Sequence, residues 1–294
     1  MSLDFNTPVR FRGVCRNFGE TKALVDIDLE IPAGGTVGLL GPNGSGKTTL
    51  LSLISGLREP TRGTVTLFGR NPQLAEARVR LGVTPQQSGI VKGMTVLQLI
   101  RFITGHFVDH ELPETLLEAF GIDHLARKRI GGLSGGQQRL LSVALAFAGR
   151  PLLVLLDEPS TGLDVNARHH LWEAIRRRSQ QGTTILLTSH YLEEVQALSD
   201  RIVMIQRGHI VADNTTSEIL RQTGVTLVKI TTSDERALAL PGAQRAWREG
   251  KTVVLATHNA SAVTKALAQA GIDYSDVDIQ KPNLEEAFAR LSTS

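Results

Sequence analysis

Short apolar runs alternate along the chain with longer stretches of helical periodicity. The runs at Thr36–Leu40, 152–156 and 184–187 are rich in branched residues, which predicts strands that are buried on both faces. Helical patterning dominates residues 96–102, 113–120 and 136–148. We therefore predict an α/β fold with a partly parallel, mixed central sheet and an α-helical insert over about residues 88–150.

The first 35 residues follow a different pattern. Apolar and polar side chains alternate over residues 9–12 and again over residues 24–31. Such alternation is typical of antiparallel strands with one face in water. We expect an antiparallel N-terminal β-subdomain beside the central sheet.

The pattern changes again after residue 224. Strand-like segments at 225–232 and 252–257 are followed by helical segments at 260–270 and 282–291. About 70 residues with two or three strands and two helices predict a small α+β accessory domain at 225–294. The larger domain then spans residues 1–224.

Composition narrows the functional classes. The chain has 32 Lys plus Arg and 29 Asp plus Glu, a net charge of +3, which does not indicate a nucleic-acid partner. The uncharged apolar stretch at 140–149 is about half of the roughly 20 residues that cross a bilayer, so we expect no membrane insertion. With a single Cys15 and no secretory start at residues 1–5, a cytoplasmic location is expected.

A phosphate-binding loop follows the first apolar run. The segment fits the pattern G-x-x-x-x-G-K-[ST] between a predicted strand and a predicted helix, the context that a P-loop NTPase requires. Its glycines allow backbone N–H groups to converge on a phosphate, while the lysine reaches the β- and γ-phosphates and the following hydroxyl binds Mg²⁺. The loop consists of Gly41, Pro42, Asn43, Gly44, Ser45, Gly46, Lys47 and Thr48, followed by Thr49.

Two adjacent carboxylates end the apolar run at 152–156. Asp157 and Glu158 stand at the carboxyl end of this predicted strand, where ligands of α/β sheets bind. We expect Asp157 to hold Mg²⁺ and Glu158 to polarise the attacking water as a catalytic base. An acidic pair that only caps the following turn is the structural alternative, and the phosphate loop disfavours it.

A second anion site is predicted at a helix start. Ser134, Gly135, Gly136 and Gln137 precede a long amphipathic helix, with Ser134 as its N-cap. Such a start offers free backbone N–H groups to an anion. One γ-phosphate does not need two cradles from the same subunit, so we expect this one to serve a nucleotide held by a second copy of the chain.

With Leu133 before them, these residues make the chain resemble the ATP-binding cassette ATPases over about residues 5–224. The resemblance implies that Phe18 stacks on adenine, that Gln86 contacts Mg²⁺ and relays to a membrane partner, and that Asp164 lies in the loop crossing the dimer interface. It also implies that His190 is the switch histidine that contacts the γ-phosphate.

Within this family, the phosphate-loop surroundings and the ending at residues 282–288 look like the ATPases of exporters with compact six-helix permeases. The resemblance implies an ATP-sandwich homodimer that powers a separate transmembrane permease, at the inner face of the membrane. The domain at 225–294 is similar to the C-terminal extension that is common in these exporter ATPases, and the resemblance implies a regulatory or dimer-stabilising role for it. A soluble cassette ATPase acting on ribosomes or DNA, and a non-catalytic nucleotide-binding regulator, are the alternatives.

Overall fold

The computed structural model describes residues 4–84, 93–223, 225–280 and 283–285. The chain forms two compact units, Met1–Asn214 and Thr215–Ser294. The division precedes the boundary predicted at residue 224, so helix α8 (Thr216–Thr223) groups with the second unit.

A six-stranded sheet, in the order β5-β6-β7-β3-β8-β9, forms the centre of the first unit. Its strands are β3 (Thr36–Leu40), β5 (Leu81–Val83), β6 (Leu153–Asp157), β7 (Thr184–Thr188), β8 (Arg201–Gln206) and β9 (His209–Thr215). The first five in this order run parallel. A two-residue turn, Arg207-Gly208, joins β8 to β9 with both residues at positive φ, as in hairpins that reverse the chain. The predicted mixed central sheet is therefore confirmed.

The register of this sheet brings three strand ends together. Every residue of β3 and β7 is buried, as expected for strands covered on both faces. Leu39 of β3 pairs with Thr188 of β7, and Asp157 of β6 pairs with the same Thr188. The segments that follow these strands consequently begin side by side, at the carboxyl ends of the strands.

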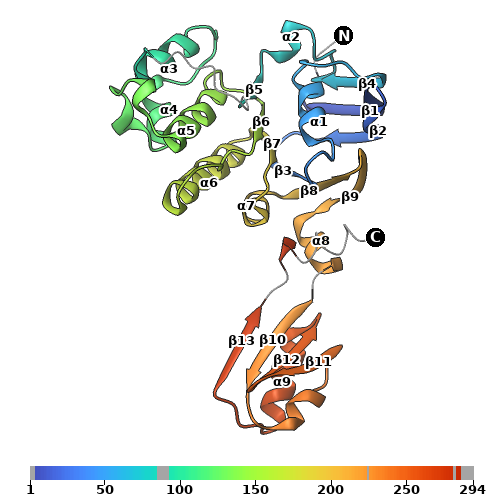
Figure 1. Cartoon of the computed structure of the whole chain (residues 1–294). Coiled ribbons are helices and arrows are strands. Elements are labelled where there is room, and N and C mark those ends of the chain that lie inside the picture. The colour runs from blue at the N-terminus through green and yellow to red at the C-terminus, as the bar shows by residue number, and fades with distance from the viewer. Residues whose placement is uncertain (1–3, 85–92, 224, 281–282, 286–294) are drawn as a thin grey trace. The chain divides into compact units, whose positions relative to one another are not determined.

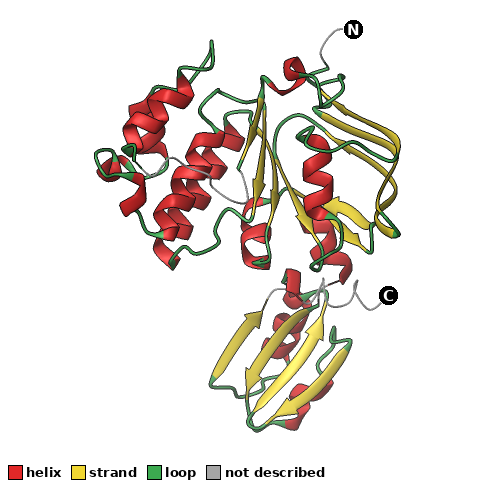
Figure 2. Cartoon of the chain, turned by 45° about the horizontal axis from the view of Figure 1, so that its top comes forward, coloured by secondary structure: helices red, strands yellow, loops and turns green. Residues whose placement is uncertain are grey.

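A three-stranded antiparallel sheet, in the order β2-β1-β4, covers one side of the unit. Its strands are β1 (Val9–Phe18), β2 (Thr21–Ile31) and β4 (Arg62–Leu67). Helix α1 (Lys47–Ile54) lies between this sheet and the central one (Figure 2). Leu50 and Leu53 of α1, Phe11 of β1 and Leu39 of β3 share one buried core, which fixes where α1 begins.

The helical insert lies on the opposite side of the central sheet (Figure 1). It contains α3 (Val96–Thr104), α4 (Pro113–Ala119) and α5 (Gly135–Ala146), with short 3₁₀ turns at Asp123–Leu125 and Ile130–Gly132. The remaining helices of the unit are α2 (Ala75–Arg78), α6 (Val165–Gln180) and α7 (Leu192–Leu198). Within the described parts of the chain, no helix is long and apolar enough to cross a membrane.

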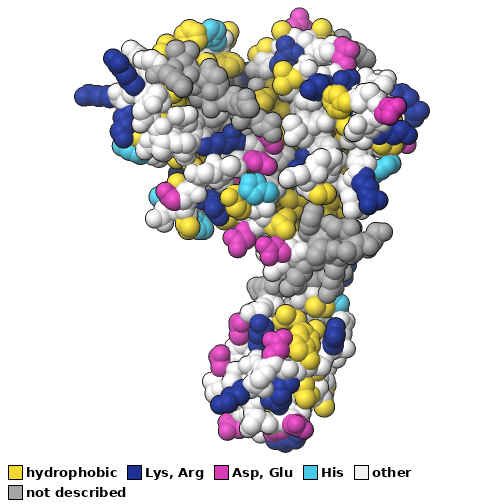
Figure 3. All heavy atoms as spheres, in the orientation of Figure 1, with side chains coloured by type: hydrophobic (Ala, Val, Ile, Leu, Met, Phe, Trp, Pro, Cys, Tyr) yellow, Lys and Arg dark blue, Asp and Glu magenta, His cyan; other side chains and the backbone are white. Residues whose placement is uncertain are grey.

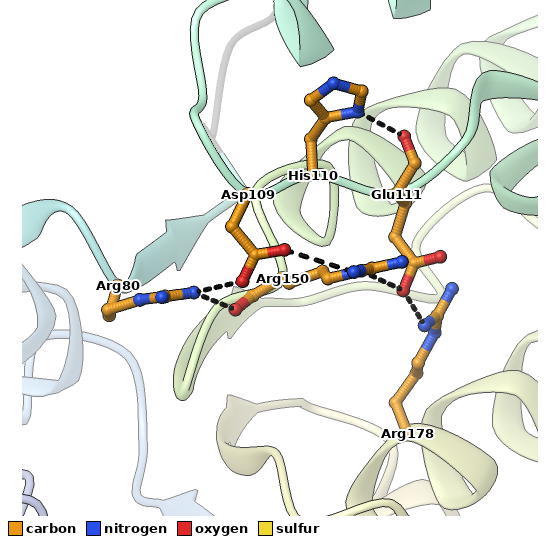
Figure 4. A network of polar contacts seen from close by, with 6 residues as sticks. All are labelled: Arg80, Asp109, His110, Glu111, Arg150 and Arg178. Atoms are coloured by element: carbon orange, nitrogen blue, oxygen red, sulfur yellow. Dashed lines mark hydrogen bonds and ion pairs between the residues drawn. The ribbon is translucent and has the colours of Figure 1, made fainter.

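Five charged side chains tie this insert to the sheet (Figure 4). Asp109 and Glu111 come from the connection between α3 and α4. Asp109 pairs with Arg80 at 2.9 Å and with Arg150 at 3.1 Å, and the hydrogen bond from Arg80 is the main reason that the pKa of Asp109 lies below its usual value. Glu111 pairs with Arg178 of α6 at 2.7 Å. These ion pairs connect the insert to three other parts of the chain. Arg80 precedes β5, Arg150 precedes β6, and Arg178 lies on α6.

The second unit contains a four-stranded antiparallel sheet, in the order β11-β12-β10-β13. Its elements are β10 (Thr226–Thr231), a 3₁₀ turn (Glu235–Ala239), β11 (Arg245–Glu249), β12 (Thr252–Thr257), α9 (Ala260–Gln269) and β13 (Asp276–Gln280). Val263 and Leu267 of α9 pack with Val228 and Val253 of the central strands. The sequence indicated two or three strands, and this number is corrected to four. The predicted helix at 282–291 lies largely outside the described residues.

We expect Arg178→Met to lower the free energy of unfolding by about 2 kcal/mol. The Arg178 and Glu111 side chains are only 14% and 13% exposed, so the variant leaves a largely buried carboxylate without its nearest cation. Arg150, 3.8 Å from Glu111, limits the loss. Urea unfolding in a Trp247→Phe background, followed by Trp172 emission, measures the change in the first unit.

The matched control is Arg101→Met, which removes an ion pair to Glu114 whose two side chains are 62% and 58% exposed. Exposed pairs contribute about 0–1 kcal/mol. Equal losses in the two variants would mean that burial adds nothing to the Arg178 pair.

Candidate functional site

The phosphate loop runs from the end of β3 to the start of α1. Gly44 and Gly46 have φ angles of 77° and 115°, which glycine adopts without steric cost. A Cβ atom on Gly41 would lie 2.1 Å from the carbonyl oxygen of Ile205, and one on Gly46 would lie 2.6 Å from that of Ala23. The spacing of glycines seen in the sequence is thus required by close backbone packing as well as by conformation.

The turn between β8 and β9 packs against this loop. The carbonyl oxygen of Ser45 accepts a hydrogen bond from the Gly208 N–H at 3.0 Å, and the Ser45 side chain is buried. The loop is therefore held in place by a neighbouring strand end. The exposed side of the loop contains Pro42, Asn43 and Gly44.

Lys47 lies over the loop that precedes it. Its Nζ donates hydrogen bonds to the carbonyl oxygens of Gly41 at 2.7 Å and Pro42 at 3.0 Å. Burial lowers the pKa of Lys47, and the nearby Glu158 and Asp157 carboxylates oppose that shift. Both predicted carboxylates therefore act on the ammonium group through their charge, although more than 100 residues separate them from Lys47 in sequence.

Asp157 and Glu158 stand where β6 ends, next to Thr188 of β7. The Thr188 hydroxyl donates a short hydrogen bond to Asp157 Oδ1, and the Asp157 N–H donates to the Thr84 hydroxyl at 3.1 Å. These contacts orient the Asp157 carboxylate. Sequence analysis did not single out Thr84 or Thr188; their signal was a threonine at the end of each strand that flanks β6.

Glu158 adopts a φ of 52°, which is uncommon for a residue with a side chain. Its Oε2 lies 3.5 Å from Nδ1 of His190 and accepts a hydrogen bond of 3.4 Å from Thr161. The His190 ring packs against Tyr191, with ring centroids 4.1 Å apart. The structure therefore brings together the predicted base and the predicted switch histidine.

Mg²⁺ fits the oxygen donors of this region. The Thr48 hydroxyl at the start of α1 and the Asp157 carboxylate are hard donors, and Mg²⁺ commonly takes one or two protein groups together with substrate phosphates. In the described residues, no group of three or more His, Cys, Asp or Glu could form a cage of protein ligands. The donor set matches a cation held jointly with a bound nucleotide.

Ser134 is the N-cap of α5, as predicted. Its hydroxyl accepts from the Gln137 N–H at 3.2 Å, and Gln137 Oε1 accepts from the Ser134 N–H at 3.2 Å, which forms a capping box. A Cβ atom on Gly135 would meet nothing within 4 Å, whereas one on Gly136 would lie 3.0 Å from the Gly162 carbonyl oxygen. Gly135 therefore faces open space, and Gly136 packs against its own chain.

A cavity of about 490 Å³ lies between this helix start and the carboxylates of the same chain. Gly135 and Gly136 line one side, and Asp157 and Glu158 line another. Arg139 of α5 also lines it and donates a short hydrogen bond to the carbonyl oxygen of Asp157. Sequence analysis missed Arg139, because a cation on an amphipathic helix usually lies on the solvated face.

The remaining predicted residues are placed as follows. Asp164 is the N-cap of α6, and its Oδ1 accepts from the Ala167 N–H at 2.9 Å. Phe18 ends β1 and is 38% exposed, with the Arg16 and Arg58 guanidinium carbons 4.7 and 4.8 Å from its ring centroid. Gln86 lies outside the described residues.

Comparison with known proteins identifies relatives over nearly the whole chain. The family described as ABC transporter matches residues 24–161. The Nod factor export ATP-binding protein I of Cupriavidus pinatubonensis is 34% identical, over 97% of this chain and 90% of its own length. A daunorubicin resistance ATP-binding protein of Streptomyces coeruleorubidus is 31% identical, over 98% of this chain and 96% of its own length.

Solved structures agree with this assignment. An ATP-binding subunit of an ABC transporter has a TM-score of 0.67 and 27% identity, over 74% of this chain and 93% of its own. The ADP-bound conformation of another ATP-binding cassette has a TM-score of 0.63 and 28% identity, over 72% of this chain and 92% of its own. The phosphate loop, the carboxylates at the end of β6 and these relatives lead to one conclusion: the chain belongs to the ABC transporter family, as one of its ATP-binding and ATP-hydrolysing subunits.

Proposed function

We propose that two copies of the chain close over two ATP molecules and drive export through a separate transmembrane permease. Each ATP lies between the phosphate loop of one copy and the Ser134–Gln137 helix start of the other. The observation that carries hydrolysis is that β3, β6 and β7 end level with one another, so that the phosphate loop begins beside Asp157 and Glu158, with His190 3.5 Å from Glu158. It supports the assembly of loop, cation and carboxylates into one phosphoryl-transfer site.

The open face of Gly135 supports the composite site. Its position at a capped helix start, with no atom within 4 Å of an added Cβ, leaves room for a phosphate of another copy against the free N–H groups. Phe18 stacks on the adenine in this arrangement, and Asp164 lies at the interface of the two copies.

During hydrolysis, Glu158 accepts a proton from the water that attacks the γ-phosphorus, while the bond to the β-phosphate oxygen breaks. His190, 3.5 Å from Glu158, contacts the γ-phosphate, and Lys47 stabilises the charge that develops on the phosphate oxygens. When bound, Mg²⁺ neutralises charge on the β- and γ-phosphates. Thr48 and Asp157 would hold it, together with Gln86, which lies outside the described residues.

The permease docks on the helical insert in this proposal, and Gln86 relays the nucleotide state to it. Large apolar side chains are exposed in the insert, with Phe102 at 55%, Leu112 at 61% and Val108 at 107% of their reference areas. Such side chains are suited to an apolar partner surface. The chain then works at the cytoplasmic face of the membrane, held there by the permease.

Export is favoured because the relatives are named for Nod factor export and daunorubicin resistance. The family match gives no support to action on ribosomes or DNA. Basic and acidic side chains are interspersed over the described residues on the face drawn in Figure 3, so that face has no strongly basic surface of the kind that binds nucleic acid. The net charge of +3 agrees with this. A regulatory role of residues 225–294 stays a prediction.

Glu158→Gln should bind ATP and lower turnover by about 10²–10⁴-fold, because the amide keeps the size of the side chain and cannot act as a base. Phosphate release measures turnover, and gel filtration with ATP should show a trapped dimer. Glu173→Gln, the same change at an exposed position of α6, is the control. Turnover above about a tenth of the parent rate would exclude Glu158 as the general base.

Lys47→Ala should weaken ATP binding and turnover together, because the charge-assisted contact is made in the ground state as well as in the transition state. Equilibrium binding of labelled ATP, measured without Mg²⁺ to prevent hydrolysis, tests this expectation. Lys265→Ala on α9 controls for the loss of a lysine. Unchanged ATP affinity in Lys47→Ala would contradict the role of the loop.

Gly135→Asp should bind ATP but fail to dimerise or hydrolyse it, because the carboxylate repels the γ-phosphate of the other copy. A mixture of Gly135→Asp and Lys47→Ala chains should recover activity, since it contains one composite site with a sound loop and a sound helix start. Differently tagged chains, purified as heterodimers, provide the sample. Normal hydrolysis by Gly135→Asp alone would exclude the composite site.

A further inference from the structure

The peptide group between Asp157 and Glu158 is held at both of its edges. Its carbonyl oxygen accepts the hydrogen bond from Arg139 Nη2. Its N–H donates to the carbonyl oxygen of Thr188 at 3.0 Å and approaches the Thr188 hydroxyl at 3.1 Å. Because a peptide group is planar, contacts at its two edges fix the plane, and the φ of Glu158 then sets the direction in which its side chain leaves the backbone.

This peptide plane needs such support. The φ of 52° at Glu158 places a residue with a side chain in the left-handed region, which costs of order 1 kcal/mol or more and persists only when surrounding contacts enforce it. Thr188 supplies the contact from β7, within the sheet. Arg139 supplies the other contact from outside the sheet, on α5.

Arg139 is held in this place by charge. Burial lowers the pKa of its guanidinium, and Asp157, Glu158 and the fully buried Glu194 oppose the shift, so the group stays positive at neutral pH. Glu194 itself accepts hydrogen bonds from Ser160 and from Trp172 Nε1. The cation therefore lies among carboxylates that surround the end of β6.

The helix that carries Arg139 begins at Ser134. Gly135 is the first residue of α5, and Arg139 follows it by one turn, a rise of about 6 Å along the helix axis. Both residues line the same 490 Å³ cavity as Glu158. A displacement of the start of α5 is consequently transmitted to the Arg139 guanidinium through one rigid helical turn.

We propose that Arg139 is a positioning residue that orients Glu158 of its own chain and links it to the helix start that faces the ATP of the other copy. The inference rests on the composite site proposed above. Arg139 holds the Asp157–Glu158 peptide in the catalytic orientation, whether or not a γ-phosphate of the partner lies on the start of α5.

The first test compares three variants in the full-length chain. Arg139→Met keeps the length of the side chain and removes its hydrogen bonds, and should lower kcat by about 10–100-fold, the loss typical of a misplaced catalytic group. KM and the affinity for ATP should change less than about twofold, since ATP binding uses the intact phosphate loop. Arg139→Lys, which keeps the charge but not the planar fork, should lie between Arg139→Met and the parent.

Arg176→Met is the matched control, because Arg176 is an exposed helix arginine that also donates to a backbone carbonyl, that of Ala197 at 2.8 Å. It should leave kcat unchanged. Parental kcat in Arg139→Met would overturn the proposal. If Arg139→Met lowered kcat, the affinity for ATP and the urea midpoint of unfolding together, Arg139 would have a general structural role. That result would overturn the proposal as well.

The second test asks on which chain Arg139 acts, using purified heterodimers. Arg139→Met paired with Gly135→Asp should be as active as the Gly135→Asp and Lys47→Ala heterodimer. Its one sound site combines the phosphate loop and Arg139 of the Gly135→Asp chain with the intact helix start of the Arg139→Met chain. Arg139→Met paired with Lys47→Ala should be nearly inactive, since the one sound loop lies in the chain that lacks Arg139.

The opposite pattern would show that Arg139 acts through the helix start on the partner's ATP, and would overturn the proposal. Failure of the composite site itself is distinguishable from this result. In that case the Gly135→Asp and Lys47→Ala heterodimer is inactive, while the kcat of the Arg139→Met homodimer still decides whether Arg139 positions Glu158.

Discussion

The parallel register of β3, β6 and β7 is the constraint on which the rest of the site depends. Leu39, Thr188 and Asp157 lie level across these three strands. The phosphate loop, the Asp157 and Glu158 carboxylates and the segment with His190 therefore all follow the carboxyl ends of the strands, on one side of the sheet. In open α/β sheets ligands bind at such carboxyl ends. The register therefore brings the Asp157 and Glu158 carboxylates to the same end of the sheet as the phosphate loop.

Charge is balanced around that edge by side chains from several elements. Lys47 from α1 and Arg139 from α5 face Asp157 and Glu158, and the buried Glu194 of α7 lies behind Arg139. Burying these groups is tolerable because each is paired or hydrogen-bonded. The hydrogen bond of Arg139 also joins α5 to the peptide group that precedes Glu158.

The helical insert is tied to the sheet by a different kind of contact. Arg80, Arg150 and Arg178 bind Asp109 and Glu111 from three separate parts of the chain (Figure 4). Ion pairs of this kind have directional geometry and moderate net energy. They set the position of the insert, and its exposed apolar side chains remain available to a partner.

The sequence by itself determined the elements whose signals are local: the buried strands, the phosphate loop at Gly41–Lys47, and the Ser134 cap, because spacing and periodicity are properties of consecutive residues. It did not reveal β11 and β13, since these are edge strands with largely polar sequences that bury little apolar surface. The tertiary structure alone decided the strand order, the approach of Glu158 to His190 and the contact of Arg139 with Asp157. Those depend on which distant segments pack together, and no local pattern encodes the register of a parallel sheet, whose strands are joined by long crossovers.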